Sequence, residues 1–395
     1  MECMETPSAI LALNGGSSSL KFALYQFGQG TETLLARGEA EEIGLPEGRL
    51  WITQSPAAPV EDDPCVFADH AAALARILDE LAKRQLPKPT AGGHRLVNGG
   101  PDYSAPQRIT PEVLTRLRAV IPLAPLHLPT ELRIIDAMAA QTPGLPQVAC
   151  FDTAFHRNMP EVARRLPMPR ALWAEGVRRY GFHGLSYEYI VGKLGVEGRR
   201  PRMVLAHLGN GASLAAVRDG SSVDTTMGMT PTGGVMMGTR TGDLDPGALL
   251  YLMREKGYDA PKLENLVDKQ SGLLGVSEVS SDMKTLLEQS ECDSRARQAV
   301  EMFCYSIRKQ IGALAATLGG LDALVFAGGI GERAVAVRAQ ICQGLEHLGV
   351  QLDAPRNTAN AEIISASASP CTVRIVATNE ELMIARHTGR LLSGA

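Results

Sequence analysis

Aromatic side chains are scarce in this 395-residue sequence, at 5% of residues, and the formal net charge is only −4. Proteins that bind nucleic acid usually carry a basic face, and those that bind single strands add aromatic rings for stacking. The sequence offers neither, so we expect no nucleic-acid partner. No apolar run approaches the roughly 20 residues that cross a bilayer, and the first residues lack the basic and apolar segments of a signal peptide. We therefore expect no membrane partner and a cytoplasmic location.

Several common binding motifs are also missing from the sequence. The seven cysteines are scattered without a CxxC pair, which is typical of reduced thiols rather than of disulfides or a zinc site. No two histidines have the spacing of metal ligands. Neither a GxxxxGK[ST] loop nor a GxGxxG turn occurs, so a bound nucleotide would need another architecture.

The length of the chain predicts two domains, because 395 residues exceed one ordinary hydrophobic core. Strand-like and helix-like segments alternate, which indicates an α/β fold. The segment "MVLAHLGNGASLAAVRDG" echoes the strand, glycine-rich turn and strand near the start of the chain, with Ser213-Leu214 aligned to Ser19-Leu20. This echo suggests a duplication, and it places the domain boundary near residue 150.

Local patterns predict the main elements. Leucine and isoleucine at positions 74, 77, 78 and 81 indicate a helix, and a second helix is expected near residues 131–140. A long amphipathic helix over residues 300–318 should end at Gly319-Gly320. The strand "LPQVACF" delivers Asp152 at its end, where α/β sheets bind ligands. The glycine-flanked "GGHRLVNGG" predicts an exposed loop that carries Arg95.

Three glycine-rich turns each follow an apolar strand, at residues 14–19, 209–213 and 328–331. The first, in "ILALNGGSSSLKFALYQ", is either a solvated surface turn or a phosphate cradle, in which glycines expose backbone N–H groups and a lysine adds charge. Each turn alone is a weak signal, since such glycines are common in bulges and tight turns. Together they suggest one extended nucleotide site.

Charged and polar candidates lie in other loops. The stretch "DTTMGMTPTGGVMMGTRTGDLDPG", residues 224–247, crowds threonines and glycines around Arg240, and it is either a long loop of capped turns or a functional loop. Arg95 is either a solvated side chain or a fork for a carboxylate or phosphoryl group. His183, flanked by glycines, is either structural or catalytic.

Eight motifs occur in order along nearly the whole chain: "LALNGGSSSLKF", "APLHLP", "FDTAFH", "YGFHGLS", "HLGNGAS", "MGTRTGDLDPG", "GGIGER" and "TNEELMIAR". Together they resemble the acetate and propionate kinase family. The resemblance implies two ribonuclease-H-like domains of the actin-like ATPase type around a nucleotide cleft, in a homodimer. Residues 1–150, joined by the C-terminal helix 381–395, would form the N-terminal domain, and residues 151–380 would form the nucleotide-binding domain.

The resemblance also implies a role for individual residues. The catalytic residues would be Asp152, Arg95, His183 and Arg240. Mg²⁺ or Mn²⁺ would be held at Asn14 and Glu380. The pocket for the acyl methyl group would be Val97, Leu126, Phe182 and Pro231. ATP or ADP would be contacted by Ser17, Ser19, Lys21, His207, Leu208, Gly209, Asn210, Gly211, Asp282, Met283, Lys284, Gly329, Ile330, Gly331, Glu332 and Arg333.

The implied activity is reversible, in-line transfer of a phosphoryl group from Mg-ATP to acetate, which is already an anionic nucleophile and needs no strong base. The alternatives are a kinase for propionate or another short acid, a kinase with another phosphoryl donor, and a non-catalytic actin-like nucleotide-binding protein. The sequence departs from the family pattern at Asn98, Leu128, Glu131, Leu185, Tyr187, Lys284 and Arg333. None of these departures removes a residue of the catalytic set, but they affect the expected acyl-chain preference and nucleotide contacts.

Overall fold

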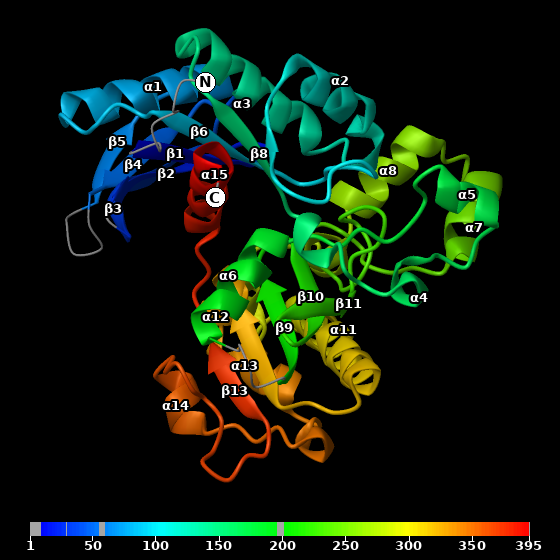
Figure 1. The fold of residues 1–395 in the computed structure, drawn as a ribbon. Helices are drawn as coiled ribbons and strands as arrows, with labels where there is room; N and C mark the ends of the chain where they lie inside the picture. Colours follow the sequence, from blue (N-terminus) through cyan, green and yellow to red (C-terminus); the bar gives the residue numbers. More distant parts are fainter. Residues whose placement is uncertain (1–8, 29, 55–59, 196–200, 395) are drawn as a thin grey trace. The chain divides into compact units, whose positions relative to one another are not determined.

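A computed structural model describes residues 9–28, 30–54, 60–195 and 201–394 (Figure 1). The chain divides into two compact units. The first unit runs to Ala154 and is completed by the residues from Asn379 onward, and the second unit is Phe155–Thr378.

The first unit is built on an eight-stranded sheet in the order β5-β4-β3-β2-β1-β6-β8-β7. Its strands are β1 (Ala9–Gly15), β2 (Leu20–Gly28), β3 (Thr31–Glu41), β4 (Arg49–Thr53), β5 (Glu61–Pro64), β6 (Ala91–Leu96), β7 (Gln107–Arg108) and β8 (Gln147–Phe151). Strands β1 and β2 form an antiparallel hairpin, while β6 and β8 run parallel to β1. The carboxyl ends of β1, β6 and β8 therefore lie at one edge of the sheet.

Helices cover both faces of this sheet. They are α1 (His70–Lys83), α2 (Pro111–Ala119), α3 (Leu128–Gln141) and α15 (Glu380–Ser393), with a short 3₁₀ turn at Ile121–Leu123. On one face α1 and α3 bury Leu74, Ile77 and Ile134 against alternate residues of β1 and β2. On the other face α15, red in Figure 1, returns from the end of the chain to pack on β1, β6 and β8.

The expectation of an exposed loop around Arg95 is wrong. Residues 91–96 form the buried strand β6, between β1 and β8. The glycines suggested a loop, but a Cβ on Gly93 would collide with Thr388 and Ile384 of α15. Glycine is therefore needed in β6 so that a helix from the far end of the sequence can approach the strand.

The second unit repeats the same arrangement in a five-stranded sheet of order β11-β10-β9-β12-β13. Its strands are β9 (Arg202–Leu208), β10 (Ala212–Arg218), β11 (Ser221–Thr225), β12 (Ala323–Ala327) and β13 (Thr372–Ile375). The hairpin β9-β10 corresponds to β1-β2, and β12 and β13 run parallel to β9 as β6 and β8 do to β1. The echo between the two halves of the sequence thus corresponds to two sheets of one topology.

The helices of the second unit are α4 (Glu161–Arg164), α5 (Arg170–Ala174), α6 (Gly184–Leu194), α7 (Pro246–Lys256), α8 (Ala260–Lys269), α9 (Gly272–Ser277), α10 (Met283–Gln289), α11 (Ser294–Leu318), α12 (Gly328–Arg333), α13 (Val335–Cys342) and α14 (Ala354–Thr358). Helix α6 packs Tyr187 and Ile190 against β9 and β10. The predicted long helix is confirmed as α11, which ends at Gly319 in a left-handed conformation. The predicted glycine-rich loop at 328–331 is instead the start of α12, and a Cβ on Gly328 would collide with the backbone of Leu208.

The predicted α/β class is confirmed, with one mixed sheet in each unit. Among the described helices, none is both long enough and apolar enough to cross a membrane. The six cysteines in the described part of the chain are all free thiols.

Candidate active site

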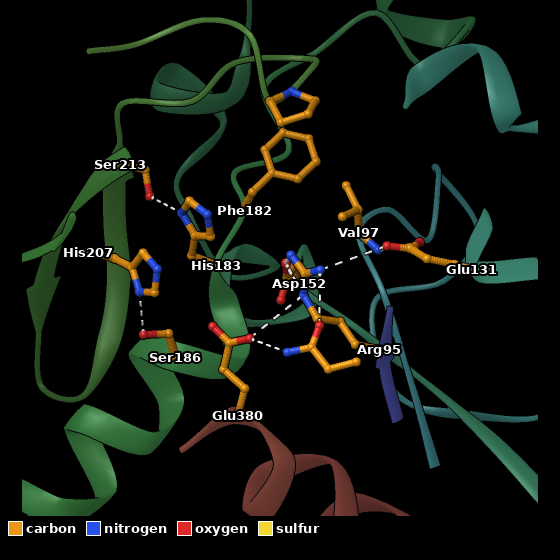
Figure 2. Close-up of polar contacts among 12 residues, drawn as sticks. Arg95, Val97, Glu131, Asp152, Phe182, His183, Ser186, His207, Ser213 and Glu380 are labelled. Carbon is orange, nitrogen blue, oxygen red and sulfur yellow. Dashed lines mark hydrogen bonds and ion pairs between the residues drawn. The ribbon is translucent and has the colours of Figure 1, made fainter. Parts of the chain in front are cut away.

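Arg95 is the centre of a charged cluster in the first unit (Figure 2). Its side chain is only 14% exposed, and its Nε and Nη2 donate to Asp152 Oδ2 at 3.0 and 2.6 Å. Asp152 follows directly after β8, as predicted, and is fully buried. Arg95 and Asp152 face each other because β6 and β8 are parallel neighbours that end together. The guanidinium also lies 3.8 Å from Glu131 and 3.9 Å from Glu380.

The balance of burial and charge decides the ionisation of this cluster. Burial alone would lower the pKa of Arg95, but the neighbouring carboxyl groups of Asp152, Glu380 and Glu131 outweigh it and raise that pKa. Burial raises the pKa of Glu131 to about 8, although Arg95 and the Val97 backbone N–H oppose the shift. The Val97 N–H donates to Glu131 Oε2 at 3.0 Å. At neutral pH the cluster therefore holds Arg95 as a cation and Glu131 largely as a neutral acid.

Asn14 joins the end of β1 to the first turn of α15. Its Nδ2 donates to Glu380 Oε2 at 2.9 Å and to Glu381 Oε1 at 3.2 Å, while its Oδ1 accepts from Arg95 Nη1 at 3.4 Å. Asn379 caps α15 by accepting from the Leu382 N–H, which fixes both glutamates in the first helical turn. Burial and the charge of Glu380 raise the pKa of Glu381.

This amide and pair of carboxyl groups fit Mg²⁺ or Mn²⁺. Both ions prefer hard oxygen ligands, and Mg²⁺ is usually held by one or two carboxylates together with substrate phosphates rather than by a complete protein cage. In the described residues, no group of three acidic, histidine or cysteine side chains poised for a metal occurs. Glu380 and the Asn14 oxygen are therefore suited to share an ion with a bound phosphate.

The predicted phosphate hairpin of the first unit is a tight turn between β1 and β2. The Gly16 N–H donates to the Ser19 carbonyl at 2.8 Å, so residues 16–19 form the connection. Ser17 is exposed, Ser19 is half-buried, and Lys21 lies on β2 directly opposite Asn14. The hairpin thus presents serine hydroxyl groups and the Lys21 ammonium group beside Asn14, which contacts Glu380.

Two stacked histidines form a second cluster, in the second unit (Figure 2). The rings of His183 and His207 lie 4.3 Å apart with an interplanar angle of 19°. Each Nδ1 contacts a serine: His183 contacts Ser213 Oγ at 2.8 Å, and His207 contacts Ser186 Oγ at 2.8 Å. His183 precedes α6 in a left-handed conformation, φ 57°, which non-glycine residues adopt at a cost.

Arg240 approaches the same place from the loop between β11 and α7. A Cβ built on Gly211 would lie 3.5 Å from Arg240 Nη1 and 3.6 Å from His183 Nε2. Arg240 Nη1 also donates to the Pro231 carbonyl at 3.1 Å, which fixes its direction. The structure thus brings three separately predicted segments together at the turn between β9 and β10.

A cavity of about 760 Å³ adjoins this turn. Its lining residues are Gly209, Asn210, Ser281, Asp282, Met283, Lys284, Leu287, Glu288, Gly329, Ile330, Arg333 and Ala334. Its volume lies within the range of about 300–1,000 Å³ that is usual for small-molecule and cofactor sites. Eight of these residues belong to the predicted nucleotide set, and two of them, Lys284 and Arg333, are departures from the family pattern.

Other members of the predicted nucleotide set lie outside that lining. Leu208 is fully buried, and His207 belongs to the histidine stack. Gly331 is also buried. Glu332 accepts the backbone N–H of Gly328 at 3.0 Å, so in this conformation it caps the start of α12.

The four residues of the predicted methyl pocket are divided between the units. Val97 and Leu126 belong to the first unit, whereas Phe182 and Pro231 belong to the second. Val97 and Phe182 are almost fully buried. The four-residue pocket therefore stays a prediction.

Some functional candidates lay outside the predicted site. Glu131 and Ser213 were not assigned to it, although Glu131 was a departure from the family motif and Ser213 belonged to a glycine-rich turn. Tyr187, another departure, contacts Ser213 Oγ at 2.5 Å. Of the remaining departures, Leu128 and Leu185 are buried, and Asn98 accepts the Gly100 N–H at 2.7 Å.

Residues 9–386 match the Acetokinase family. The acetate kinase of Methylocella silvestris is 47% identical over 97% of this chain and 98% of its own length, and that of Phocaeicola vulgatus is 42% identical over 97% and 99%. The crystal structure of Porphyromonas gingivalis acetate kinase is similar, with a TM-score of 0.85, 40% identity and coverage of 98% and 100%. A propionate kinase from Francisella tularensis gives a TM-score of 0.89, 37% identity and coverage of 96% and 99%.

Proposed function

Because this chain belongs to the acetokinase family, we propose that it transfers the γ-phosphoryl group of ATP to the carboxylate of acetate and releases acetyl phosphate and ADP. The chain is thus a kinase, and its chemistry is a reversible phosphoryl transfer. One observation supports the assignment of this activity to particular residues of the chain. A cavity of nucleotide size opens beside the turn at which His183 Nε2 and Arg240 Nη1 converge.

The second unit supplies groups for the nucleotide and its phosphates. The cavity would take the adenosine, and the backbone of residues 209–211 would face the phosphates. His183 Nε2 and the Arg240 guanidinium would donate to the oxygens of the transferring phosphoryl group, where negative charge must be stabilised during an in-line displacement. Both groups are held before substrate binds, by Ser213 and by the Pro231 carbonyl respectively.

The first unit supplies groups for the acceptor and the metal ion. Arg95 would neutralise the charge of acetate, which would otherwise repel the triphosphate. Asp152 accepts two hydrogen bonds from Arg95 and is fully buried, and this geometry supports a positioning role rather than that of an obligatory base. Asn14 and Glu380 would hold Mg²⁺ or Mn²⁺, which would offset the charge of the phosphates when bound.

The assay is acyl phosphate formation, trapped with hydroxylamine, from purified protein, Mg-ATP and a series of acetate, propionate and butyrate. The proposal expects the highest kcat/KM with acetate. A higher value with propionate would make the protein a propionate kinase, which is the name of the Francisella tularensis relative. The protein could instead bind the nucleotide and turn over no carboxylate, first with ATP and then with pyrophosphate as the donor. This result would refute acetate kinase activity and favour a non-catalytic role.

We also propose a homodimer and a cytoplasmic location. Helix α7 supports the dimer, because no residue of this helix is buried and its Leu250, Tyr251 and Met253 are 47%, 53% and 47% exposed. Exposed apolar surface is a feature of interaction sites. Light scattering coupled to size exclusion would give the mass of the assembly, and a monomer at micromolar concentration would refute the dimer. The cytoplasmic location stays a prediction from the cysteine usage.

A further inference from the structure

A chain of hydrogen bonds runs from the interior of the second unit to the histidine stack. The Tyr187 hydroxyl contacts Ser213 Oγ at 2.5 Å, and Ser213 Oγ contacts His183 Nδ1 at 2.8 Å. Tyr187 and Ser213 are both fully buried. Its far end, His183 Nε2, lies beside Gly211 and Arg240.

Local structure holds the members of this chain in place. His183 and Tyr187 are one helical turn apart, and the Tyr187 N–H donates to the His183 carbonyl at 3.1 Å. Ser213 on β10 is paired directly with His207 on β9. Ser186, the neighbour of Tyr187, contacts His207 in the same way that Ser213 contacts His183. Helix α6 is therefore attached to the hairpin through two adjacent side chains.

We propose that Tyr187 is a positioning residue that fixes the tautomer of His183 through Ser213, so that the neutral imidazole carries its proton on Nε2. The inference rests on the proposed function, in which Nε2–H donates to a phosphoryl oxygen. It assigns a role to a tyrosine that does not itself reach the substrate groups.

The direction of these hydrogen bonds follows from the number of hydrogens on each hydroxyl group. A serine hydroxyl has one hydrogen, so Ser213 can donate to His183 or to Tyr187 but not to both. A phenol is the stronger donor of the two hydroxyls, because its pKa of about 10 is far below that of an alcohol. When Tyr187 donates to Ser213, the buried serine hydrogen is left to donate to His183 Nδ1, the other contact that Ser213 Oγ makes, and Nδ1 is then an acceptor. The proton of a neutral ring is left on Nε2.

The opposite tautomer of His183, with the proton on Nδ1, does not suit the position of Nε2. With the proton on Nδ1, Nε2 would present a lone pair to an anionic phosphoryl oxygen beside Arg240. With the proton on Nε2, the same nitrogen presents a donor at the place that Gly211 leaves open. The stacked ring of His207 keeps His183 in the required plane.

The first test is ¹⁵N NMR of the full chain with labelled histidine rings, with and without the substitution Tyr187→Phe. The ring of Tyr187 packs beside Phe155 and His156, and phenylalanine preserves that packing while removing only the hydroxyl. His183→Gln assigns the signals of His183. The proposal expects the Nε2–H tautomer to dominate in the native protein and to lose population in Tyr187→Phe. An unchanged tautomer ratio would overturn it.

The second test is kinetic, with Tyr180→Phe as the matched control. Tyr180 is also buried, but its hydroxyl donates to the Gly176 carbonyl at 2.9 Å, away from the histidines. We expect Tyr187→Phe to lower kcat about fivefold to tenfold, as for the loss of one hydrogen bond in the transition state, with the KM for ATP unchanged. Tyr180→Phe should leave both values and the tautomer unchanged. Equal kcat in native protein and Tyr187→Phe would overturn the proposal.

The two tests separate this inference from the proposed function. The tautomer is read from the protein without substrate, so it reports on Tyr187 even if no carboxylate is phosphorylated. Failure of the hydroxylamine assay with an intact Nε2–H tautomer would refute the proposed function. Normal acetate phosphorylation with an unchanged tautomer in Tyr187→Phe would refute only the role of Tyr187.

Discussion

Replacing Glu131 by glutamine should remove a pH-dependent loss of stability from the first unit. Glu131 is 2% exposed, and its Oε2 accepts the Val97 N–H while its other oxygen lies 3.8 Å from Arg95. Glutamine has nearly the same shape and keeps an oxygen for the Val97 N–H, but it does not ionise. The substitution therefore isolates the effect of the proton.

The direction in which stability changes with pH follows from the shift of the Glu131 pKa. Burial raises the pKa of Glu131 from 4.5 to about 8 in the folded protein. Between these two values the folded state binds the proton and the unfolded state does not, so rising pH favours unfolding. The stabilisation is fully present below the unfolded pKa and is lost as the pH rises through the folded pKa. One pKa unit corresponds to about 1.4 kcal/mol, which gives an upper limit of about 5 kcal/mol for the whole window.

The assay is the melting temperature of native protein and Glu131→Gln over a pH series from about 5 to about 9, which spans the window of the shift. The variant should gain stability relative to native protein as the pH rises, by several degrees in total, since 1 kcal/mol corresponds to about 2–4 °C for a domain of this size. Glu301→Gln, which removes an exposed carboxylate from α11, is the control and should show no such gain. A constant difference between Glu131→Gln and native protein across the series would refute the reasoning.

Three substitutions test the other assigned roles. Arg240→Ala should lower kcat about 10³-fold, which is the scale of one lost transition-state donor. Nucleotide affinity, measured by calorimetry, should stay nearly intact. A loss of nucleotide binding alone would contradict the role of Arg240. Asn14→Ala should raise the Mg²⁺ concentration needed for half-maximal activity, because the amide that contacts Glu380 is lost together with its oxygen. Unchanged metal dependence would remove Asn14 from that role. Val97→Ala should raise the ratio of propionate to acetate kcat/KM by enlarging the space near Arg95, and an unchanged ratio would place the methyl pocket elsewhere.

Features that depend on local sequence were predicted correctly. Apolar spacing located α11, and its glycine end was visible in the sequence because a left-handed residue closes the helix. The run "QVACF" placed Asp152 at a strand end, and the parallel-sheet rule made that end a candidate site. The long segment of residues 226–245 indeed lacks helices and strands.

Features that depend on distant segments could not be predicted in the same way. Gly93 is required because Ile384 and Thr388 approach the strand, a contact across nearly 300 residues of sequence that no local pattern records. Gly328, at the start of α12, is required because the backbone of Leu208, on another strand, approaches it closely. In both places glycine makes room for a neighbour, whereas local rules associate it with a turn.

The surroundings of Arg95 show the same limit in electrostatic terms. The sequence marked Arg95 and Asp152, but it gave no sign that Glu131 and Glu380 also lie within 4 Å of the guanidinium. If all three carboxyl groups were ionised around one arginine, the cluster would carry two excess negative charges and would repel an anionic acceptor. Burial of Glu131 on α3 lowers the excess to one negative charge, because it keeps this carboxyl group largely protonated at neutral pH. The charge of the cluster thus depends on how deeply one helix residue is buried, which only the folded structure reveals.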